Sequence, residues 1–405
     1  MGRTPLEPER EHRWVDPRTK PEPPLESAEA RLAENEADIV ELMALCKAGR
    51  IYEVERWIRS GKPLQVRLEG RGPWHRPKTP LKVAIDTGQY DLALLLLCNG
   101  YSAEAEPPGT LNLALERRAW NFVDLMLAWG ADPEQADPYF ILDTYQRTLM
   151  DRFWELGVDF SQDNTLASYL SEATRNKPAY GWARRHNSDP KIAYQLALAL
   201  EDAVSEDREK AACLLLWAGA DPRRKVPSLR WGSGVEDDPD DDRQSAIECA
   251  VHSGHGHLLR HLKPDPKLDD IDELYTWVSD PVTLRHLAAL QPPQDWSVTI
   301  VRNINMWSYA WRDSHARECL RQIFEDQCGR LSTLDDEGCR ELRRAMLKLG
   351  DYDLKWLLRF LGRTNYCDRT IFLELIRTPS MKKRMVRIGL ESGQPGRSRR
   401  GRAVR

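Results

Sequence analysis

The sequence predicts an all-α protein, a solenoid of stacked helix-turn-helix units with a less regular helical part toward the C-terminus. Three observations predict this class. Two segments, 79–100 and 109–130, carry the same apolar pattern thirty residues apart. Within each segment the apolar residues recur every three or four positions in two short blocks, which is the spacing of amphipathic helices. A glycine closes each segment, and similar glycines recur along the chain.

The two segments read TPLKVAIDTGQYDLALLLLCNG and GTLNLALERRAWNFVDLMLAWG. The apolar pattern of each is broken once, near Gly88 or Arg118, so each predicts two short helices joined by a tight turn. Neither helix can bury its apolar stripe alone, and neighbouring units must therefore stack. The matching positions are Leu81/Leu111, Ala84/Ala114, Leu92/Phe122, Leu95/Leu125, Leu97/Leu127 and Gly100/Gly130.

Glycines locate further units. Twelve residues separate the turn glycine Gly88 from the closing glycine Gly100, and the pairs Gly49/Gly61 and Gly350/Gly362 keep this spacing. A helix that ends in this way needs a left-handed residue just beyond its last turn, a conformation that glycine or asparagine adopts with little strain. The predicted closing positions are Gly61, Gly100, Gly130, Gly157, Asn187 and Gly219.

The pattern resembles the ankyrin repeat, whose unit carries Thr-Pro-Leu-His, an alanine pair, a Gly-His turn and a closing Gly-Ala-Asp. Two stretches match it best: Thr79, Pro80, Leu81, Ala84 and Gly88, and then Ser245, Ile247, Ala250, Gly254 and His255. Lys82, Asn112 and Glu248 replace the histidine of the family. The resemblance implies a non-enzymatic scaffold or adaptor that binds another protein.

The expected organisation has four parts. They are a disordered, proline-rich arm over 1–30; a repeat array over 37–266 with inserts near 62–78 and 223–243; a helical extension over 267–378 with one further unit near 340–363; and a basic, disordered tail over 379–405. The arm and the tail hold too little apolar surface to offset the entropy lost on ordering.

Composition favours a cytoplasmic protein that does not enter a membrane. The net charge of the 405 residues is −4, which selects no class of partner. The apolar run Leu92 to Leu97 is far shorter than the roughly 20 residues that a membrane-spanning helix needs. Eight cysteines occur without a CxxC pair and are expected to be reduced thiols.

Candidate partner-binding residues lie in the inserts and on exposed tryptophans. A basic loop with an aromatic residue can hold a phosphate or an acidic partner, although a solvated loop whose tryptophan packs on the next helix explains the same residues. Tryptophan and arginine supply much of the energy at protein interfaces. The candidates are Arg67, Arg71, Trp74, Arg76, Trp182 and Trp231.

No catalytic, cofactor-binding or metal-binding residue is predicted. The sequence holds no HExxH, GxSxG or lysine-bearing phosphate loop. A cluster of possible zinc ligands comprises Cys249, His252, His255, His257 and His261. The repeat register explains His255 as a turn residue and His261 as a stripe position, however, and the acidic insert lacks the ligand spacing of a calcium loop.

The basic tail supports a second function, non-specific binding of nucleic acid through phosphate contacts. Its aromatic content is nil, so base stacking is not expected. A third hypothesis is an inhibitor or immunity protein that masks its partner. The candidate nucleic-acid residues are Lys382, Lys383, Arg384, Arg397, Arg399 and Arg400.

Overall fold

A computed structural model describes residues 32–66, 78–103, 109–229, 243–293, 296–308, 314–325, 336–362, 367 and 369–390. Its regular structure is almost entirely helical, which confirms the all-α class. The exceptions are two short strands, β1 (Leu32–Ala33) and β2 (Gln65–Val66), which pair in parallel, and one bridge between Val226 and Gln244. None of the helices in these residues is long and apolar enough to cross a membrane.

The chain divides into two compact units, Met1–Gln195 and Leu196–Arg405, and the boundary falls within helix α11 (Pro190–Ser205). Strand β1 precedes residue 37, the expected start of the array. It pairs with β2, which lies in the first insert. Gln65 of β2 also exchanges two hydrogen bonds of 3.2 Å with the backbone of Ser102. The first insert is therefore fixed at its base by the segment that follows helix α4 (Tyr90–Cys98).

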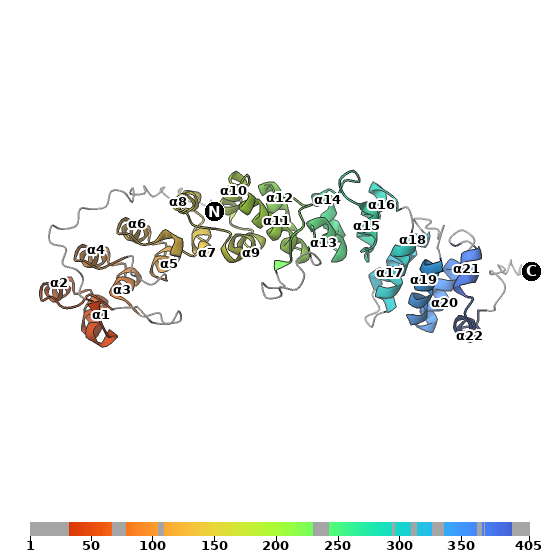
Figure 1. The fold of residues 1–405 in the computed structure, drawn as a ribbon, viewed down its shortest axis with the longest axis horizontal. Coiled ribbons are helices and arrows are strands. Elements are labelled where there is room, and N and C mark those ends of the chain that lie inside the picture. The colour runs from red at the N-terminus through yellow and green to blue at the C-terminus, as the bar shows by residue number, and fades with distance from the viewer. Residues whose placement is uncertain are drawn as a thin grey trace, which may run out of the picture. The chain divides into compact units, whose positions relative to one another are not determined.

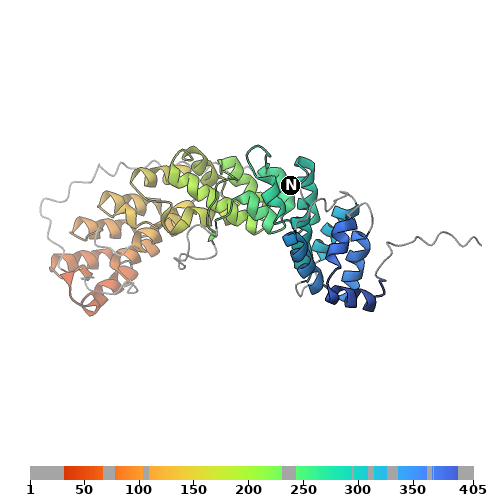
Figure 2. The ribbon, with the colours of Figure 1, turned by 45° about the vertical axis from the view of Figure 1, so that its right-hand side comes forward.

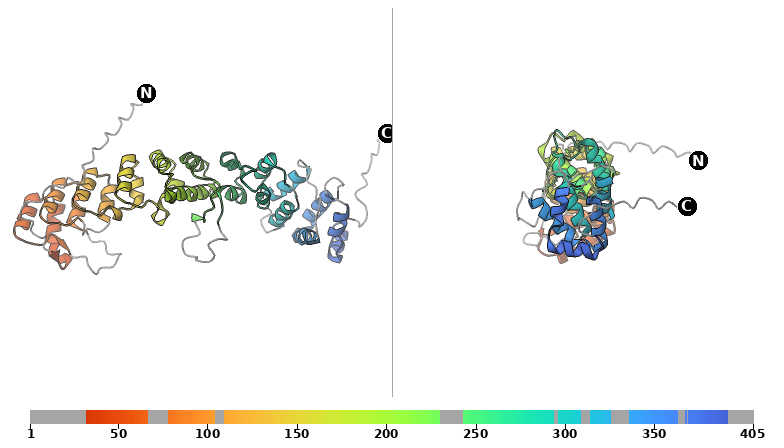
Figure 3. Two further views of the ribbon diagram at one scale, coloured as in Figure 1. Left: turned by 45° about the horizontal axis from the view of Figure 1, so that its top comes forward. Right: turned by 90° about the vertical axis from the view of Figure 1, so that its right-hand side faces the viewer.

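Helices of the first unit come in successive pairs (Figures 1 and 3). The first helices of neighbouring pairs contact one another in the order α1, α3, α5, α7, α9, and contacts between α4 and α6 and between α8 and α10 join second helices. Short 3-10 helices lead into some pairs: η1 (Glu36–Ile39), η2 (Pro133–Gln135) and η3 (Gln162–Asn164). The pairs are α1 (Val40–Lys47) with α2 (Ile51–Arg59), α3 (Pro80–Asp86) with α4 (Tyr90–Cys98), α5 (Gly109–Glu116) with α6 (Trp120–Ala128), α7 (Pro138–Leu142) with α8 (Arg147–Glu155), and α9 (Thr165–Glu172) with α10 (Lys177–Arg185).

The turns follow one register. Five helix pairs have a left-handed residue between their helices and a second one twelve residues later: Gly49 with Gly61, Gly88 with Gly100, Arg118 with Gly130, Tyr145 with Gly157, and Asp207 with Gly219. Three of the turn residues are not glycine, although a side chain there costs about 1–2 kcal/mol. The geometry of the turn is therefore kept where the glycine is lost.

Three predicted positions do not follow this register. Asn187 has no positive φ, because the chain enters α11 directly through Asp189, whose carboxylate accepts hydrogen bonds from the first backbone amides of that helix. Gly350 begins its helix with extended backbone at φ −63°, and Gly362 is right-handed at φ −75°. The prediction of left-handed closure at Asn187 is wrong, and Gly350 and Gly362 keep the spacing of a turn and a closing glycine without the left-handed backbone.

Side chains one residue after the turn connect neighbouring pairs. The Gln89 amide donates to the carbonyl of Cys46 at 3.3 Å, and the Asn176 amide donates to the carbonyl of Leu142 at 2.7 Å. In the second unit His255 follows Gly254 in the same way, and its Nε2 lies 3.2 Å from the carbonyl of Ser205. Each contact reaches the end of the first helix in the preceding pair.

The second unit is less regular. Contacts join α17 to both α18 and α19, and α19 to α21; the helices that end the unit pack side by side (the blue group of Figure 2). Its elements are α12 (Glu209–Ala218), α13 (Ala246–His252), η5 (Gly256–Leu258), α14 (Leu259–Leu262), α15 (Ile271–Tyr275), α16 (Pro281–Leu290), α17 (Ser297–Ser308), α18 (Ser314–Glu325), α19 (Asp336–Lys348), α20 (Asp351–Leu361), α21 (Arg369–Leu375) and α22 (Pro379–Arg387).

The basic tail does not begin as a disordered segment. Thr378 caps α22, Pro379 occupies its first turn, and both residues favour a helix start. Met381, Met385 and Ile388 are buried on one side of the helix, at the spacing of an amphipathic stripe. The residues from 391 onward lie outside the described part of the chain.

Candidate protein-interaction surface

One exposed tyrosine lies in the short helix α7, and a second lies just beyond its end. The side chain of Tyr139 is 50% exposed, and that of Tyr145, three residues beyond the end of the helix, is 40% exposed. A chain of contacts joins them through Tyr169, Asp143 and Arg118. We call these five residues the α7 patch.

Local sequence places Tyr139 on the surface. The Asp137 carboxylate caps α7 by accepting a hydrogen bond of 2.9 Å from the backbone N–H of Tyr139, and Pro138 fits the first helical position. The side chain of Asn112 accepts a hydrogen bond of 2.8 Å from the backbone N–H of Asp137. The helix start, and with it Tyr139, is thereby fixed to the preceding helix pair.

A buried tyrosine supports Tyr139 from the next pair. The rings of Tyr139 and Tyr169 meet edge to face at 5.5 Å, and Tyr169 is only 5% exposed. The Tyr169 hydroxyl accepts a hydrogen bond of 2.8 Å from the Asn176 amide and donates to Asp143 at 3.5 Å. Burial, with a smaller contribution from the Asp143 carboxylate, raises the pKa of Tyr169 well above its usual value. This tyrosine therefore stays a neutral donor.

Arg118 completes the patch from the preceding turn. Its guanidinium donates to the backbone carbonyl of Asp143 at 3.3 Å and lies 5.9 Å from the centre of the Tyr145 ring. Both Arg118 and Tyr145 have left-handed backbone, and both are exposed. An exposed arginine beside two exposed tyrosines has the composition of protein-binding hot spots.

Of the tryptophans predicted to be exposed anchors, Trp182 is described, and its prediction is wrong. Trp182 is fully buried in α10. Its ring packs 4.6 Å from Phe160 and 5.7 Å from Trp154. The large apolar area of the indole is removed from water there, so it belongs to the core.

Most other predicted site residues lie outside the described part of the chain: Arg67, Arg71, Trp74, Arg76 and Trp231 in the inserts, and Arg397, Arg399 and Arg400 in the tail. The remaining three lie on α22. Lys382 and Lys383 are exposed. Arg384 instead donates to the carbonyls of Leu347 and Leu349 and pairs with Asp351. Its role is to hold the end of α19, so it is a weaker candidate for nucleic acid.

In the Cys/His cluster, His255 and His257 face the same carboxylate, Asp207, and His261 faces a different one, Glu209. His257 pairs with Asp207 at 2.9 Å, and His261 contacts Glu209 at 2.8 Å. Burial raises the pKa of Cys249 to about 12, so its thiol is not a ready metal ligand. Within the described ranges no group of three or more histidines, cysteines and carboxylates is arranged to hold a metal ion.

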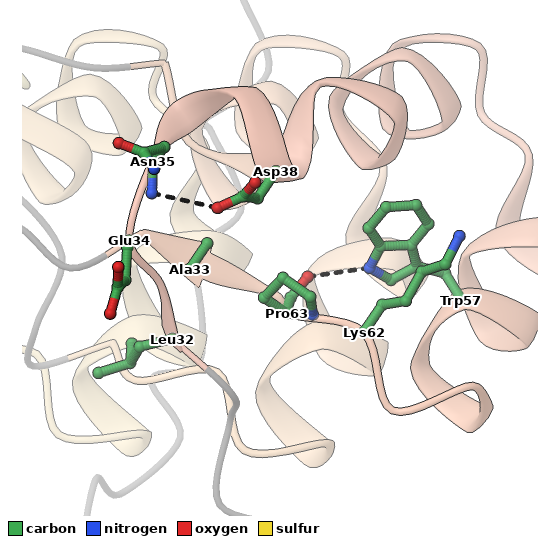
Figure 4. A pocket seen from close by; sticks show the side chains of 8 residues that line it. All are labelled: Leu32, Ala33, Glu34, Asn35, Asp38, Trp57, Lys62 and Pro63. Atoms are coloured by element: carbon green, nitrogen blue, oxygen red, sulfur yellow. Dashed lines mark hydrogen bonds between the residues drawn. The ribbon is translucent and has the colours of Figure 1, made fainter.

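A shallow pocket of about 600 Å³ lies beside β1 (Figure 4). Lys62 covers the ring of Trp57 at 4.1 Å, and the Trp57 indole donates to the carbonyl of Pro63 at 2.9 Å. Asp38 accepts a hydrogen bond from the backbone of Asn35. Lys62 also pairs with Glu41 at 3.5 Å, so the contacts of these groups are with neighbouring residues.

Comparison with known proteins adds no assignment. No protein-family model matches the chain, and none of the curated proteins compared with it matches.

The sequence did contain a signal for the α7 patch: the twelve-residue spacing, counted back from Gly157 and Gly130, ends at Tyr145 and Arg118. A bulky residue at a turn position that favours glycine is a mark of function or strain.

Proposed function

We propose that the chain is an ankyrin-type helical repeat protein that binds another protein through the α7 patch. The observation that carries this proposal is the shared register of left-handed turn residues in five helix pairs. Stacked pairs of this kind present extended surfaces without needing a catalytic site. Within this register Arg118 and Tyr145 occupy turns, and Tyr139 lies on a first helix.

The register also relates Tyr139 to the resemblance with the ankyrin repeat. Lys82, Asn112, Tyr139 and Glu248 all precede the turn residue of their pair by six positions, where the family carries histidine. Asn112 has a structural role, because its side chain accepts a hydrogen bond from the backbone of Asp137 in the next pair. Tyr139 instead leaves half of its side chain in solvent, so its substitution is expected to affect binding more than folding.

Tyr139→Ala is expected to weaken binding of the natural partner at least about thirtyfold, the loss typical of a hot-spot tyrosine. The matched control is Tyr52→Ala, because Tyr52 is 79% exposed on the second helix of its pair. The tagged full-length protein is used to capture its partner after nuclease treatment, and the affinity of each variant is then measured. Equal losses for both variants would reject the α7 patch as the interface.

The exposed Lys382 and Lys383 favour nucleic-acid binding as a second candidate function. Because α22 is packed through Met381 and Met385, the test should retain this helix. Lys382→Gln/Lys383→Gln is expected to reduce affinity for DNA or RNA and to make its dependence on salt less steep. Val386→Gln, an exposed uncharged position on the same helix, is the control. An unchanged salt dependence would dismiss this function.

A further inference from the structure

Arg302 lies near the middle of α17 as a half-buried cation without a counter-ion among the described residues. Its Nε is buried and has no hydrogen-bond partner there. The contact that the structure gives its guanidinium is with the Trp277 ring, whose centre lies 5.2 Å away. Trp277 is 39% exposed, so solvent reaches the site.

The pKa of Arg302 agrees with the lack of a counter-ion among the described residues. Burial lowers the pKa of its guanidinium below the usual value, whereas a nearby carboxylate would raise it. Taking an unpaired charge partly out of water is unfavourable. Retaining such a charge reduces stability, which is typical of groups that bind a ligand of opposite charge.

His252 borders the same tryptophan. The imidazole at the end of α13 meets the Trp277 ring edge to face at 5.3 Å. Burial, followed by the charge of Arg302, lowers the pKa of His252. The imidazole is therefore neutral near pH 7, and the site carries a single positive charge.

Two other half-buried arginines of the second unit have carboxylate partners, whereas Arg317 lies over the rings of Trp307, Tyr352 and Trp356. Arg223 pairs with Asp269 at 3.0 Å, and Arg208 pairs with Asp202 at 3.2 Å. The more exposed Arg321 pairs with Glu318 at 3.0 Å. Arg302 differs from the paired arginines in having an aromatic neighbour and no carboxylate within the described residues.

We propose that Arg302, with Trp277 and His252 beside it, is the receptor for one carboxylate group of an acidic segment of the partner protein. A guanidinium fork matches a carboxylate in geometry and charge. A phosphate ester would bring about two negative charges against one positive charge. The inference rests on the proposed protein-binding function and names the chemistry of the partner.

The probe is a fluorescein-labelled peptide of alternating glycine and glutamate, titrated into the full-length protein and followed by fluorescence anisotropy. Arg302→Gln is expected to weaken its binding at least about tenfold. Arg321→Gln is the matched control and should leave the affinity unchanged, because that guanidinium is already paired. A peptide of glycine and glutamine should not bind. Equal effects of the two substitutions, or tighter binding of a phosphoserine peptide, would overturn the proposal.

Thermal melting distinguishes a binding role from a structural one. Because Arg302→Gln removes an uncompensated cation, its Tm is expected to stay the same or to rise by about 2–4 °C. A fall in Tm with unchanged peptide affinity would make Arg302 a packing residue and overturn the inference. If Tyr139→Ala abolishes capture while Arg302→Gln changes neither capture nor peptide binding, the proposed function stands and this inference fails.

Discussion

Gly256→Ala is expected to lower the free energy of unfolding of the second unit by about 3 kcal/mol, the upper end of the usual cost of overpacking. A Cβ atom at Gly256 would lie 2.4 Å from the backbone nitrogen of Thr283 and 2.6 Å from its Cα. These are backbone atoms of α16, and Thr283 is fully buried, so neither side can move without separating η5 from α16. Denaturant unfolding followed by circular dichroism measures the loss.

Gly181→Ala is the matched control for this overpacking. The added Cβ would meet Nη2 of Arg147 at 2.7 Å, but that atom is the end of an exposed, flexible side chain that can rotate away. Alanine within a helix is favoured over glycine by up to about 1 kcal/mol. Gly181→Ala should therefore be neutral or slightly stabilising. A Gly256→Ala protein as stable as wild type would show that η5 and α16 do not approach as described.

Asp124→Ala is expected to destabilise the first unit by about 3–5 kcal/mol, the cost of leaving one member of a buried ion pair behind. Asp124 on α6 and Arg152 on α8 meet at 2.6 Å, with side chains only 8% and 11% exposed. Their contact joins the second helices of neighbouring pairs. Loss of Asp124 leaves the Arg152 guanidinium buried without this carboxylate.

The exposed pair of Asp86 and Arg117 is the control for this substitution. It also joins neighbouring pairs, but its atoms are 3.4 Å apart and its side chains are 49% and 57% exposed. Asp86→Ala should cost no more than about 1 kcal/mol, since water screens the interaction. If the two alanine variants unfold at the same denaturant concentration, the buried pair does not hold the helices together.

Much of the helix pairing could be predicted from sequence, because the residue just beyond a helix end often needs left-handed backbone and glycine adopts it with little strain. Gly88 and Gly100 therefore located the turn and the end of one pair correctly. Arg118 and Tyr145 were not predicted to be surface anchors, because propensity alone does not show that a bulky residue can adopt left-handed backbone. Gly350 was predicted to be a turn glycine, but it caps the start of α20, a position that also tolerates glycine.

Predictions of exposure were less successful than predictions of helices. Trp182 lies three residues after Ala179 and one before Ala183, both buried, so helical spacing was consistent with a core position. Its selection as an anchor rested on residue type, which does not determine the face of a helix. The strand β1 was missed because two residues give no periodic pattern, and its pairing with β2 is set by tertiary contacts.

Hydrogen exchange of the full-length protein, alone and with its captured partner, tests the central claim most directly. The proposed function predicts slower exchange on binding in α5, α7 and the turns that carry Arg118 and Tyr145, with no change in α2 or α4. Protection confined to α22, or none in the residues around the α7 patch, would contradict it.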